Sequence, residues 1–171
     1  MNKKVLVTGG TGFIGSHLVD LLLKNNYQVC VIDNFLRGNK LSNISKGNIE
    51  LIQGDIKNLD LIIESSKNCH YIFHLAAFLG VDEVAKNPVE TMETEIVGAL
   101  NVVNAAKTNN VQKIIYASTS GVYGKINFED SVNENVSVSP TSSYAISKRY
   151  NEIYLKAINK DFNIDTFSLR Y

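Results

Sequence analysis

The chain has 171 residues, a length usual for a single domain. Its 17 acidic and 17 basic side chains balance, so it offers no excess positive charge to nucleic acid or to an anionic membrane surface. No apolar run approaches the ~20 residues that span a bilayer, and two cysteines, Cys30 and Cys69, are too few for a disulfide framework or a zinc site of paired ligands. We therefore expect a cytoplasmic protein with reduced, buried thiols and no bound metal, which binds neither nucleic acid nor a membrane.

Short apolar runs alternate with helical patterns along the chain. In chain order we expect a strand at residues 4–8, a helix at 13–24, a strand at 28–33, a polar loop at 34–48, a strand at 49–53, a helix at 58–66, a strand at 70–75, a helix at 88–108, a strand at 113–117, a loop at 118–143, a helix at 144–159 and a strand at 164–169. This alternation indicates a parallel sheet, and the apolar strands indicate that both of its faces are covered. The predicted fold class is α/β, a doubly wound parallel sheet (Rossmann fold) with helices on both faces.

The turn between the first strand and the first helix is crowded with glycine, in the stretch TGGTGFIG. Gly9, Gly12 and Gly15 form the pattern G-x-x-G-x-x-G. Such a turn needs backbone angles that glycine adopts cheaply, and bare backbone lets a pyrophosphate approach the positive end of the following helix. The pattern alone also fits a purely structural turn.

Asp33 ends the second strand, about twenty residues after the glycines. A carboxylate there accepts hydrogen bonds from the adenosine ribose and repels a 2′-phosphate, which favours NAD over NADP. Two alternatives remain at this point: Asp33 caps its own loop, and the nearby Arg37 faces a phosphate rather than solvent.

Tyr144 and Lys148 are four residues apart in the stretch SSYAISK, which places them on one face of a helix. A nearby ammonium and a cationic nicotinamide would both favour the phenolate of Tyr144, and Lys148 could also hold the nicotinamide ribose. The hydroxyls of Ser118 and Thr119, at the end of the fifth strand, could donate to a substrate oxygen. Each of these residues also has an ordinary structural interpretation: a core-edge tyrosine, a surface lysine and local turn hydrogen bonds.

The motifs follow one another in the order of a known family. They are TGGTGFIG from Thr8, DNF from Asp33, GDI from Gly54, HLAA from His74, ASTSGVYG from Ala117 and P-x-x-x-YAISK from Pro140. In these motifs the chain resembles the extended short-chain dehydrogenase/reductase family, in its nucleotide-sugar epimerase/dehydratase branch, and the resemblance runs nearly end to end.

The resemblance implies NAD as the cofactor and assigns its parts to matched residues. The residues implied to contact NAD are Gly9, Gly12, Phe13, Ile14 and Gly15 at the pyrophosphate, Asp33, Asn34 and Gly38 at the adenosine ribose, Asp55 and Ile56 at the adenine, Leu75, Ala76 and Ala77 beneath the cofactor, and Tyr144 and Lys148. Thr119, Tyr144 and Lys148 match the catalytic Ser/Thr, Tyr and Lys.

The chain departs from the family pattern at two places. Dehydratases of this branch carry Asp-Glu after the catalytic Thr and the related decarboxylases carry Glu, whereas this chain has Ser120 and Gly121. The absence of these acidic residues favours epimerisation, in which the tyrosine alone can move the proton. The long helix often carries Asn where this chain has Glu95, so we expect a different contact near the nicotinamide.

The resemblance therefore implies an NAD-dependent nucleotide-sugar epimerase, most similar to 4-epimerases, acting by transient oxidation to a keto-sugar and return of the hydride. Two alternatives stay open: a dehydratase or decarboxylase with an unusual acid, and a dinucleotide-binding module without turnover. Members of the family continue for roughly as many residues again, so we expect residues 1–171 to be the NAD-binding domain of a truncated chain without its substrate domain. The helices at 88–108 and 144–159 often pair between subunits in this family, which implies a homodimer.

Overall fold

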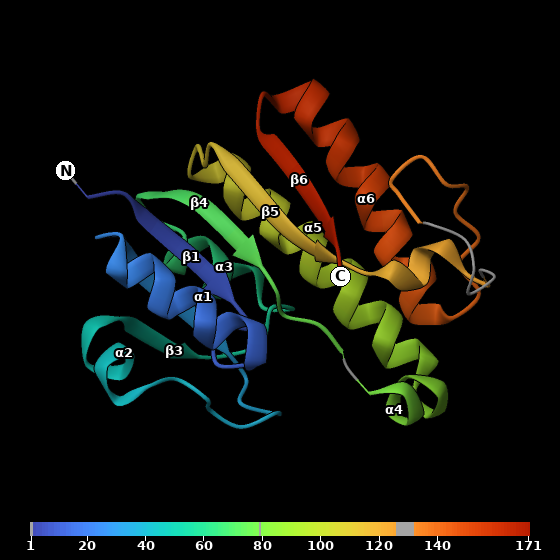
Figure 1. Ribbon diagram of the computed structural model, residues 1–171. Helices are drawn as coiled ribbons and strands as arrows, with labels where there is room; N and C mark the ends of the chain where they lie inside the picture. Colours follow the sequence, from blue (N-terminus) through green and yellow to red (C-terminus); the bar gives the residue numbers. More distant parts are fainter. Residues whose placement is uncertain (1, 79, 126–131) are drawn as a thin grey trace.

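The six expected strands lie in one parallel sheet (Figure 1). The computed structural model describes residues 2–78, 80–125 and 132–171. The strands are β1 (Lys4–Thr8), β2 (Gln28–Asp33), β3 (Glu50–Gln53), β4 (Cys69–His74), β5 (Lys113–Ser118) and β6 (Asp165–Arg170). Their spatial order is β3-β2-β1-β4-β5-β6, and every neighbouring pair is parallel. This order confirms the predicted doubly wound sheet, whose direction of winding reverses between β1 and β4.

The α-helices are α1 (Phe13–Lys24), α2 (Asn43–Asn48), α3 (Leu59–Ser65), α4 (Val81–Lys86), α5 (Pro88–Thr108) and α6 (Ser143–Phe162), with a 3-10 turn η1 (Ser120–Tyr123). Three of these α-helices, α2, α3 and α6, begin at a residue whose side chain accepts from a free backbone amide. Asn58 accepts a hydrogen bond from the Leu61 amide at the start of α3, and Ser142 accepts one from Ala145 at the start of α6, both at 3.1 Å. Pro88 begins α5, where its missing N–H costs no helical bond.

The sequence prediction differs from the structure mainly in the loops. The prediction of a polar loop at 34–48 was wrong for the last six of these residues, which form α2. Neither α4 nor η1 was predicted, and α6 continues to Phe162, beyond the expected end at residue 159. Residues 126–131 of the loop expected at 118–143 lie outside the described residues.

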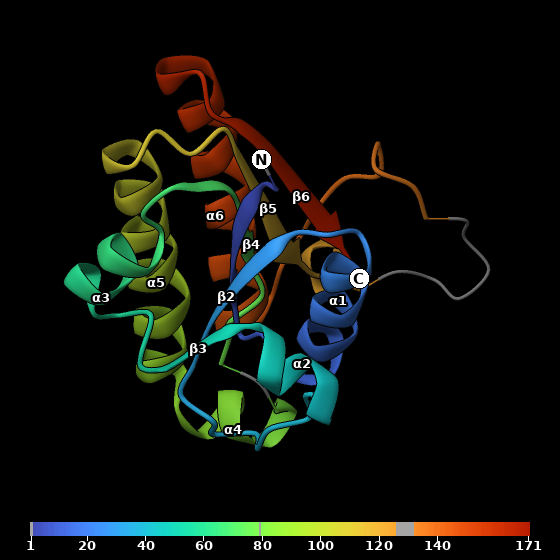
Figure 2. The same cartoon turned by 90° about the vertical axis from the view of Figure 1, so that its left-hand side faces the viewer.

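Helices cover the two faces of the sheet unequally (Figure 2). On one face α3, α5 and α6 bury an apolar cluster that includes Ile72, Ile114 and Leu155. On the other face a smaller cluster lies between α1 and the strands β1 and β2. On that second face Phe167 and Leu169 of β6 are 50% and 43% exposed. Helices thus lie on both faces, as predicted, but the second face stays open where β6 lies.

Four helix-to-strand connections contain an asparagine in the left-handed region. These are Asn26, Asn68, Asn110 and Asn163, with φ between 54° and 61°. Asparagine tolerates this conformation because its short polar side chain bonds locally, and a left-handed residue ends a helix. Each of the four comes one to three residues before a strand, so each marks the place where the chain passes from a helix back into the sheet.

Cys30 and Cys69 are both free and buried, as predicted. Burial raises the pKa of the Cys30 thiol to about 12 and that of Cys69 to about 11. Neither thiol is therefore reactive at neutral pH. Within the described residues, none of the helices combines the length and apolar character needed to cross a membrane.

Candidate active site

A cavity of about 300 Å³ opens at the carboxyl ends of the strands, around the turn between β1 and α1. Most of the residues implied to contact NAD line it. Those that do are Gly9, Gly12, Phe13, Ile14, Gly15, Asp33, Asn34, Asp55, Ile56, Leu75, Ala76 and Ala77. We call this cavity the dinucleotide cleft. The carboxyl edge of a doubly wound sheet is where such folds bind nucleotides.

The turn leading into the cleft can be built only with glycine. Gly9 has a φ of +70°, and a Cβ on it would lie 2.6 Å from the Ala76 amide nitrogen. A Cβ on Gly15 would lie 2.3 Å from the carbonyl oxygen of Gly9. Gly15 therefore allows α1 to pack directly on the turn, and Gly9 allows the turn to pass against the end of β4.

The start of α1 presents backbone donors to the cleft. Gly12 is the N-cap residue and supplies no side-chain acceptor. The amides of Phe13, Ile14 and Gly15 occupy the first turn, where an α-helix offers them no acceptor of its own. Because α1 begins without an acidic side chain in its first turn, nothing there competes with an anion. The donor set therefore fits a pyrophosphate.

Asp33 caps its own loop and also lines the cleft, so the loop-capping interpretation does not exclude a contact with the ribose. Its Oδ2 accepts from the Thr11 amide at 3.0 Å and its Oδ1 accepts from the Phe35 amide at 2.9 Å, so it does cap its loop. It also lines the cleft, where each carboxylate oxygen retains acceptor capacity for a ribose hydroxyl. Arg37 lines the same cleft.

Gly38 does not line the cleft. Instead its carbonyl oxygen accepts from the Thr11 hydroxyl at 3.1 Å, and its φ is +77°, so it shapes the loop that carries Asp33 and Asn34. Several other lining residues were given no role by the sequence. They are Thr11, Ile32, Leu36, Gly54, Lys57, Phe78, Glu90, Thr94 and Ala117. Thr11, Gly54 and Ala117 lie within the quoted motifs, whereas Glu90 and Thr94 belong to α5, which only the fold brings to the cleft.

Tyr144 lines a second cavity of about 480 Å³, formed with apolar side chains of α4 and its surroundings. We call this the tyrosine cavity. Phe78 lines both cavities, so the two adjoin at this residue. Lys148 lies one helical turn further along α6, with its Nζ 5.3 Å from the centre of the Tyr144 ring, which confirms that the two side chains share a face.

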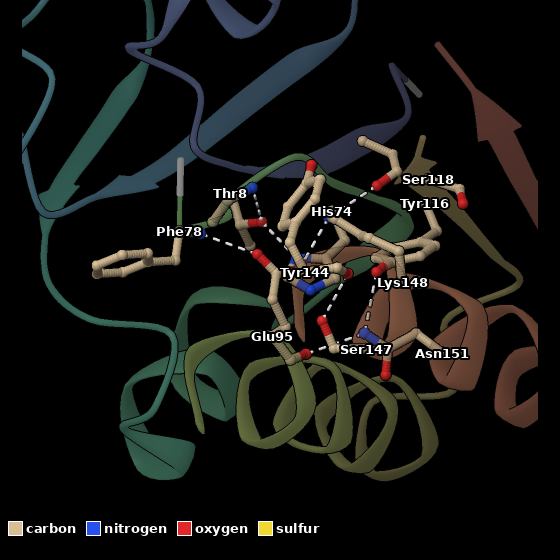
Figure 3. A network of polar contacts seen from close by, with 12 residues as sticks. Thr8, His74, Phe78, Glu95, Tyr116, Ser118, Tyr144, Ser147, Lys148 and Asn151 are labelled. Atoms are coloured by element: carbon tan, nitrogen blue, oxygen red, sulfur yellow. Dashed lines mark hydrogen bonds and ion pairs between the residues drawn. The ribbon is translucent and has the colours of Figure 1, made fainter. Parts of the chain in front are cut away.

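Lys148 is 1% exposed and therefore not the surface lysine of the structural interpretation (Figure 3). Its Nζ donates to the Ala117 carbonyl oxygen at 2.9 Å and lies 3.0 Å from Oε2 of Glu95, which is also 1% exposed. Apart from this ion pair, Oε2 has no hydrogen-bond partner among the described residues. The other oxygen, Oε1, accepts from the Phe78 amide at 2.8 Å.

The charges at this end of the site do not favour the phenolate. Burial raises the pKa of Tyr144, and the negative charge of Glu95 raises it further. The expected effect of the Lys148 ammonium, together with a cationic nicotinamide, stays a prediction, because burial and Glu95 are the two causes that shift this pKa in the protein without a cofactor.

The other side chains of the network are uncharged, and among the described residues the buried Oδ1 of Asn151 has no hydrogen-bond partner. His74 is buried with its Nδ1 2.8 Å from the Thr8 hydroxyl, and burial together with Lys148 lowers its pKa to about 3. Asn151 donates to the Tyr116 hydroxyl at 2.9 Å and to the Glu95 carbonyl oxygen at 3.0 Å. His74 is thus uncharged at neutral pH, and Lys148 and Glu95 carry the buried charges of this network.

The two candidate hydroxyls have different surroundings. Ser118 is buried and donates to Oε1 of Glu152 at 2.6 Å, so it belongs to the contact between β5 and α6. Thr119 is partly exposed, and its Oγ1 accepts from the Gly121 amide at 3.1 Å. Its hydroxyl hydrogen is left to donate. The structure thus favours Thr119 over Ser118 as the donor to a substrate.

Comparison with known proteins agrees with this geometry. A sequence profile of the NAD dependent epimerase/dehydratase family matches residues 5–171. The chain belongs to the NAD dependent epimerase/dehydratase family. NAD, the predicted cofactor, is the cofactor that gives this family its name.

Relatives within the family have different activities. A putative UDP-glucose 4-epimerase of Methanocaldococcus jannaschii is 38% identical, over 98% of this chain and 54% of its own length. A UDP-N-acetyl-alpha-D-glucosaminuronate decarboxylase of Bacillus cytotoxicus is 39% identical, over 89% of this chain and 49% of its own. The fold matches that of a UDP-N-acetylglucosamine 4-epimerase of Methanobrevibacter ruminantium with a TM-score of 0.91 and 37% identity, over 99% of this chain and 55% of that one. The chain thus spans about half the length of these relatives.

Proposed function

We propose that this chain is the NAD-binding and catalytic part of a nucleotide-sugar epimerase, most similar to the 4-epimerases. The observation that carries the proposal is that the dinucleotide cleft adjoins the tyrosine cavity at Phe78. The nearby end of β5 carries Thr119 followed by Ser120 and Gly121, which have no carboxyl group to expel water or assist decarboxylation. Tyrosine and threonine alone suffice to move a proton on and off a hydroxyl.

In the proposed complex the first-turn amides of α1 would hold the pyrophosphate, and Asp33 would accept from the adenosine ribose. Leu75, Ala76 and Ala77 form the floor of the cleft. When bound, NAD would accept a hydride from a sugar carbon and return it to the opposite face of that carbon.

The side chains of this chain would then handle the proton. Tyr144, as phenolate, would remove the proton of the sugar hydroxyl and return it after the hydride has come back. Thr119 would donate to the same oxygen and fix its direction. Lys148 would orient the tyrosine and the cofactor from the buried side of the site.

The test has two steps. Titration of the chain with NAD, followed by protein fluorescence or calorimetry, should show saturable binding that Gly12→Asp abolishes through a negative side chain at the pyrophosphate site. The longest natural form of the protein should then interconvert UDP-sugar epimers, read by proton NMR of the products. Tyr144→Phe should reduce this turnover by 100-fold or more, on the order of a lost general base. Unchanged turnover in Tyr144→Phe would disprove the catalytic assignment.

The same NMR assay separates the alternatives. A dehydratase or decarboxylase, which the Bacillus cytotoxicus relative keeps open, would release water or carbon dioxide and give a lighter product. A dinucleotide-binding module without turnover would bind NAD and leave every sugar nucleotide unchanged.

We also propose a homodimer in the cytoplasm, with sugar contacts coming from residues equivalent to the other half of the relatives. Four exposed apolar side chains support the predicted pairing through α5 and α6: Val97, Ile146, Tyr150 and Ile153 are between 37% and 56% exposed. Light scattering on the chain and on Ile153→Glu should show a dimer that the new charge dissociates.

A further inference from the structure

Glu95 occupies a place from which it can act on both parts of the site. It belongs to α5, whereas Lys148 belongs to α6 and Phe78 to the segment after β4. Figure 3 shows the carboxylate of Glu95 between them. One oxygen holds the Phe78 amide at 2.8 Å and the other lies 3.0 Å from the Lys148 ammonium. A single carboxylate thus joins the wall shared by the two cavities to the lysine behind Tyr144.

Both charges of this pair are withdrawn from water. Glu95 and Lys148 are each 1% exposed, and burial of an unpaired charge would be strongly unfavourable. The ammonium is therefore kept at Ala117 by its pairing with Glu95 as well as by its hydrogen bond. Asparagine, which the family often carries at this position, could accept from the Phe78 amide but could not neutralise the lysine.

Among the described residues, four titratable groups of the network enter this balance at Tyr144. Glu95 comes from α5 and Lys148 from α6, while Tyr116 of β5 and His74 of β4 are buried and uncharged at neutral pH. The Lys148 ammonium favours the phenolate, and the Glu95 carboxylate, which is paired with it at 3.0 Å, opposes the phenolate.

We propose that Glu95 is a positioning residue for the proposed reaction, on which this inference rests: it fixes Lys148 and the segment at Phe78, and it cancels the charge of Lys148 at Tyr144. Tyr144 then stays protonated in the free protein. It becomes a base only when a further positive charge, such as an oxidised nicotinamide, enters the site.

The test follows the ionisation of Tyr144 without any turnover. Tyrosine is labelled with carbon-13 at Cζ, and Tyr144→Phe identifies the Tyr144 signal. In the parent chain this signal should not titrate up to the highest pH at which the chain stays folded. In Glu95→Gln, which keeps the acceptor for Phe78, the signal should begin to titrate within this pH range, because a like charge has been removed. An unchanged signal in Glu95→Gln would overturn the proposal.

Three further variants keep the result interpretable. Glu93→Gln removes a charge from an exposed position of the same helix and should leave the signal as in the parent. Glu95→Gln combined with Lys148→Gln removes both charges and should restore the parent behaviour, and a signal that still titrates early would assign the effect to shape. If Glu95→Gln does not fold, Glu95→Asn replaces it with the same expected shift.

Addition of NAD distinguishes this proposal from the proposed function. Saturating NAD should lower the pH at which the parent Tyr144 signal titrates. If NAD binds without moving the signal while Glu95→Gln does move it, Glu95 cancels the charge as proposed and the role of Tyr144 as the base is wrong. If neither moves it, Glu95 does not control Tyr144.

Discussion

The two ends of the site are built by opposite means. The dinucleotide cleft is open, and its donors for a pyrophosphate are backbone groups: the first-turn amides of α1, which the glycine turn positions. The Lys148 end is closed and made of side chains, with an ion pair from two different helices. Backbone donors hold their geometry because the fold itself fixes them, whereas the buried pair depends on each partner staying charged. The cleft should therefore tolerate most side-chain changes and the buried end should tolerate few.

The largest expected effect, and the strongest test of this difference between the two ends, comes from removing one buried charge. Glu95→Ala leaves the Lys148 ammonium without its partner, so we expect the free energy of unfolding to fall by about 3–5 kcal/mol. Glu95→Leu combined with Lys148→Met removes both charges and should cost much less, because an apolar pair of similar size avoids the desolvation of two ions. Urea denaturation of the three proteins gives the comparison. A loss below about 1 kcal/mol in Glu95→Ala would show that the pair contributes little to stability.

At the open end the largest effect should come from a single methyl group. In Gly15→Ala the new Cβ would meet the Gly9 carbonyl oxygen at 2.3 Å, so α1 must move off the turn. We expect a loss of about 2–3 kcal/mol in stability together with loss of NAD binding. Gly47→Ala is the matched control, because nothing lies within 4 Å of a Cβ there and alanine favours the helix. Equal effects of the two substitutions would contradict the backbone-built cleft.

A third, smaller effect is the pH dependence of the folding stability that arises where α6 contacts β5 and β6. Burial would raise the pKa of Glu152, but hydrogen bonds from Arg170, Ser118 and Arg149 lower it from its usual 4.5 to about 2. Because the pKa is depressed in the folded state, this group adds stability above pH 4.5, and that stability is lost as the pH falls from about 4.5 to 2. Denaturation at a series of pH values should show this loss. Glu152→Gln should flatten it, and an unchanged slope would assign the loss to other carboxyl groups.

The smallest expected effect lies far from both ends, at the left-handed asparagines. Asn110→Gly should change stability by only a few tenths of a kcal/mol, because glycine adopts a positive φ without strain. Asn110→Val should cost about 1–2 kcal/mol, because a β-branched residue does not. Thermal unfolding of the two variants tests this. A valine variant as stable as the parent would mean that the turn can change its conformation.

Sequence reasoning predicted the backbone-built end well because its signals are local. The alternation of strands and helices, the glycine spacing and Asp33 are all read within a few residues, and the structure places each where expected. Helix α2 was missed because its six residues include Gly47 and have no apolar period. Its N-cap, Ser42, also bonds to Asp20 of α1, a contact across 22 positions.

The buried end could be predicted only in part. The spacing of Tyr144 and Lys148 indicated a shared face, and Glu95 was noticed as a departure from the family. Nothing in the sequence pairs Glu95 with Lys148, because 53 residues separate them and only the packing of α5 on α6 brings them together. The raised pKa of Tyr144 follows from the same packing, which buries the phenol and places the Glu95 carboxylate near it.

The left-handed asparagines limit how the chain can change in length. Each connection from Asn26, Asn68, Asn110 and Asn163 to its strand is at most three residues long. One extra residue there would push a strand along by about 3.3 Å and turn its core side chains to the opposite face. Insertions should therefore be rejected at these four connections and tolerated better in a long loop of the carboxyl edge, such as residues 34–42 between β2 and α2.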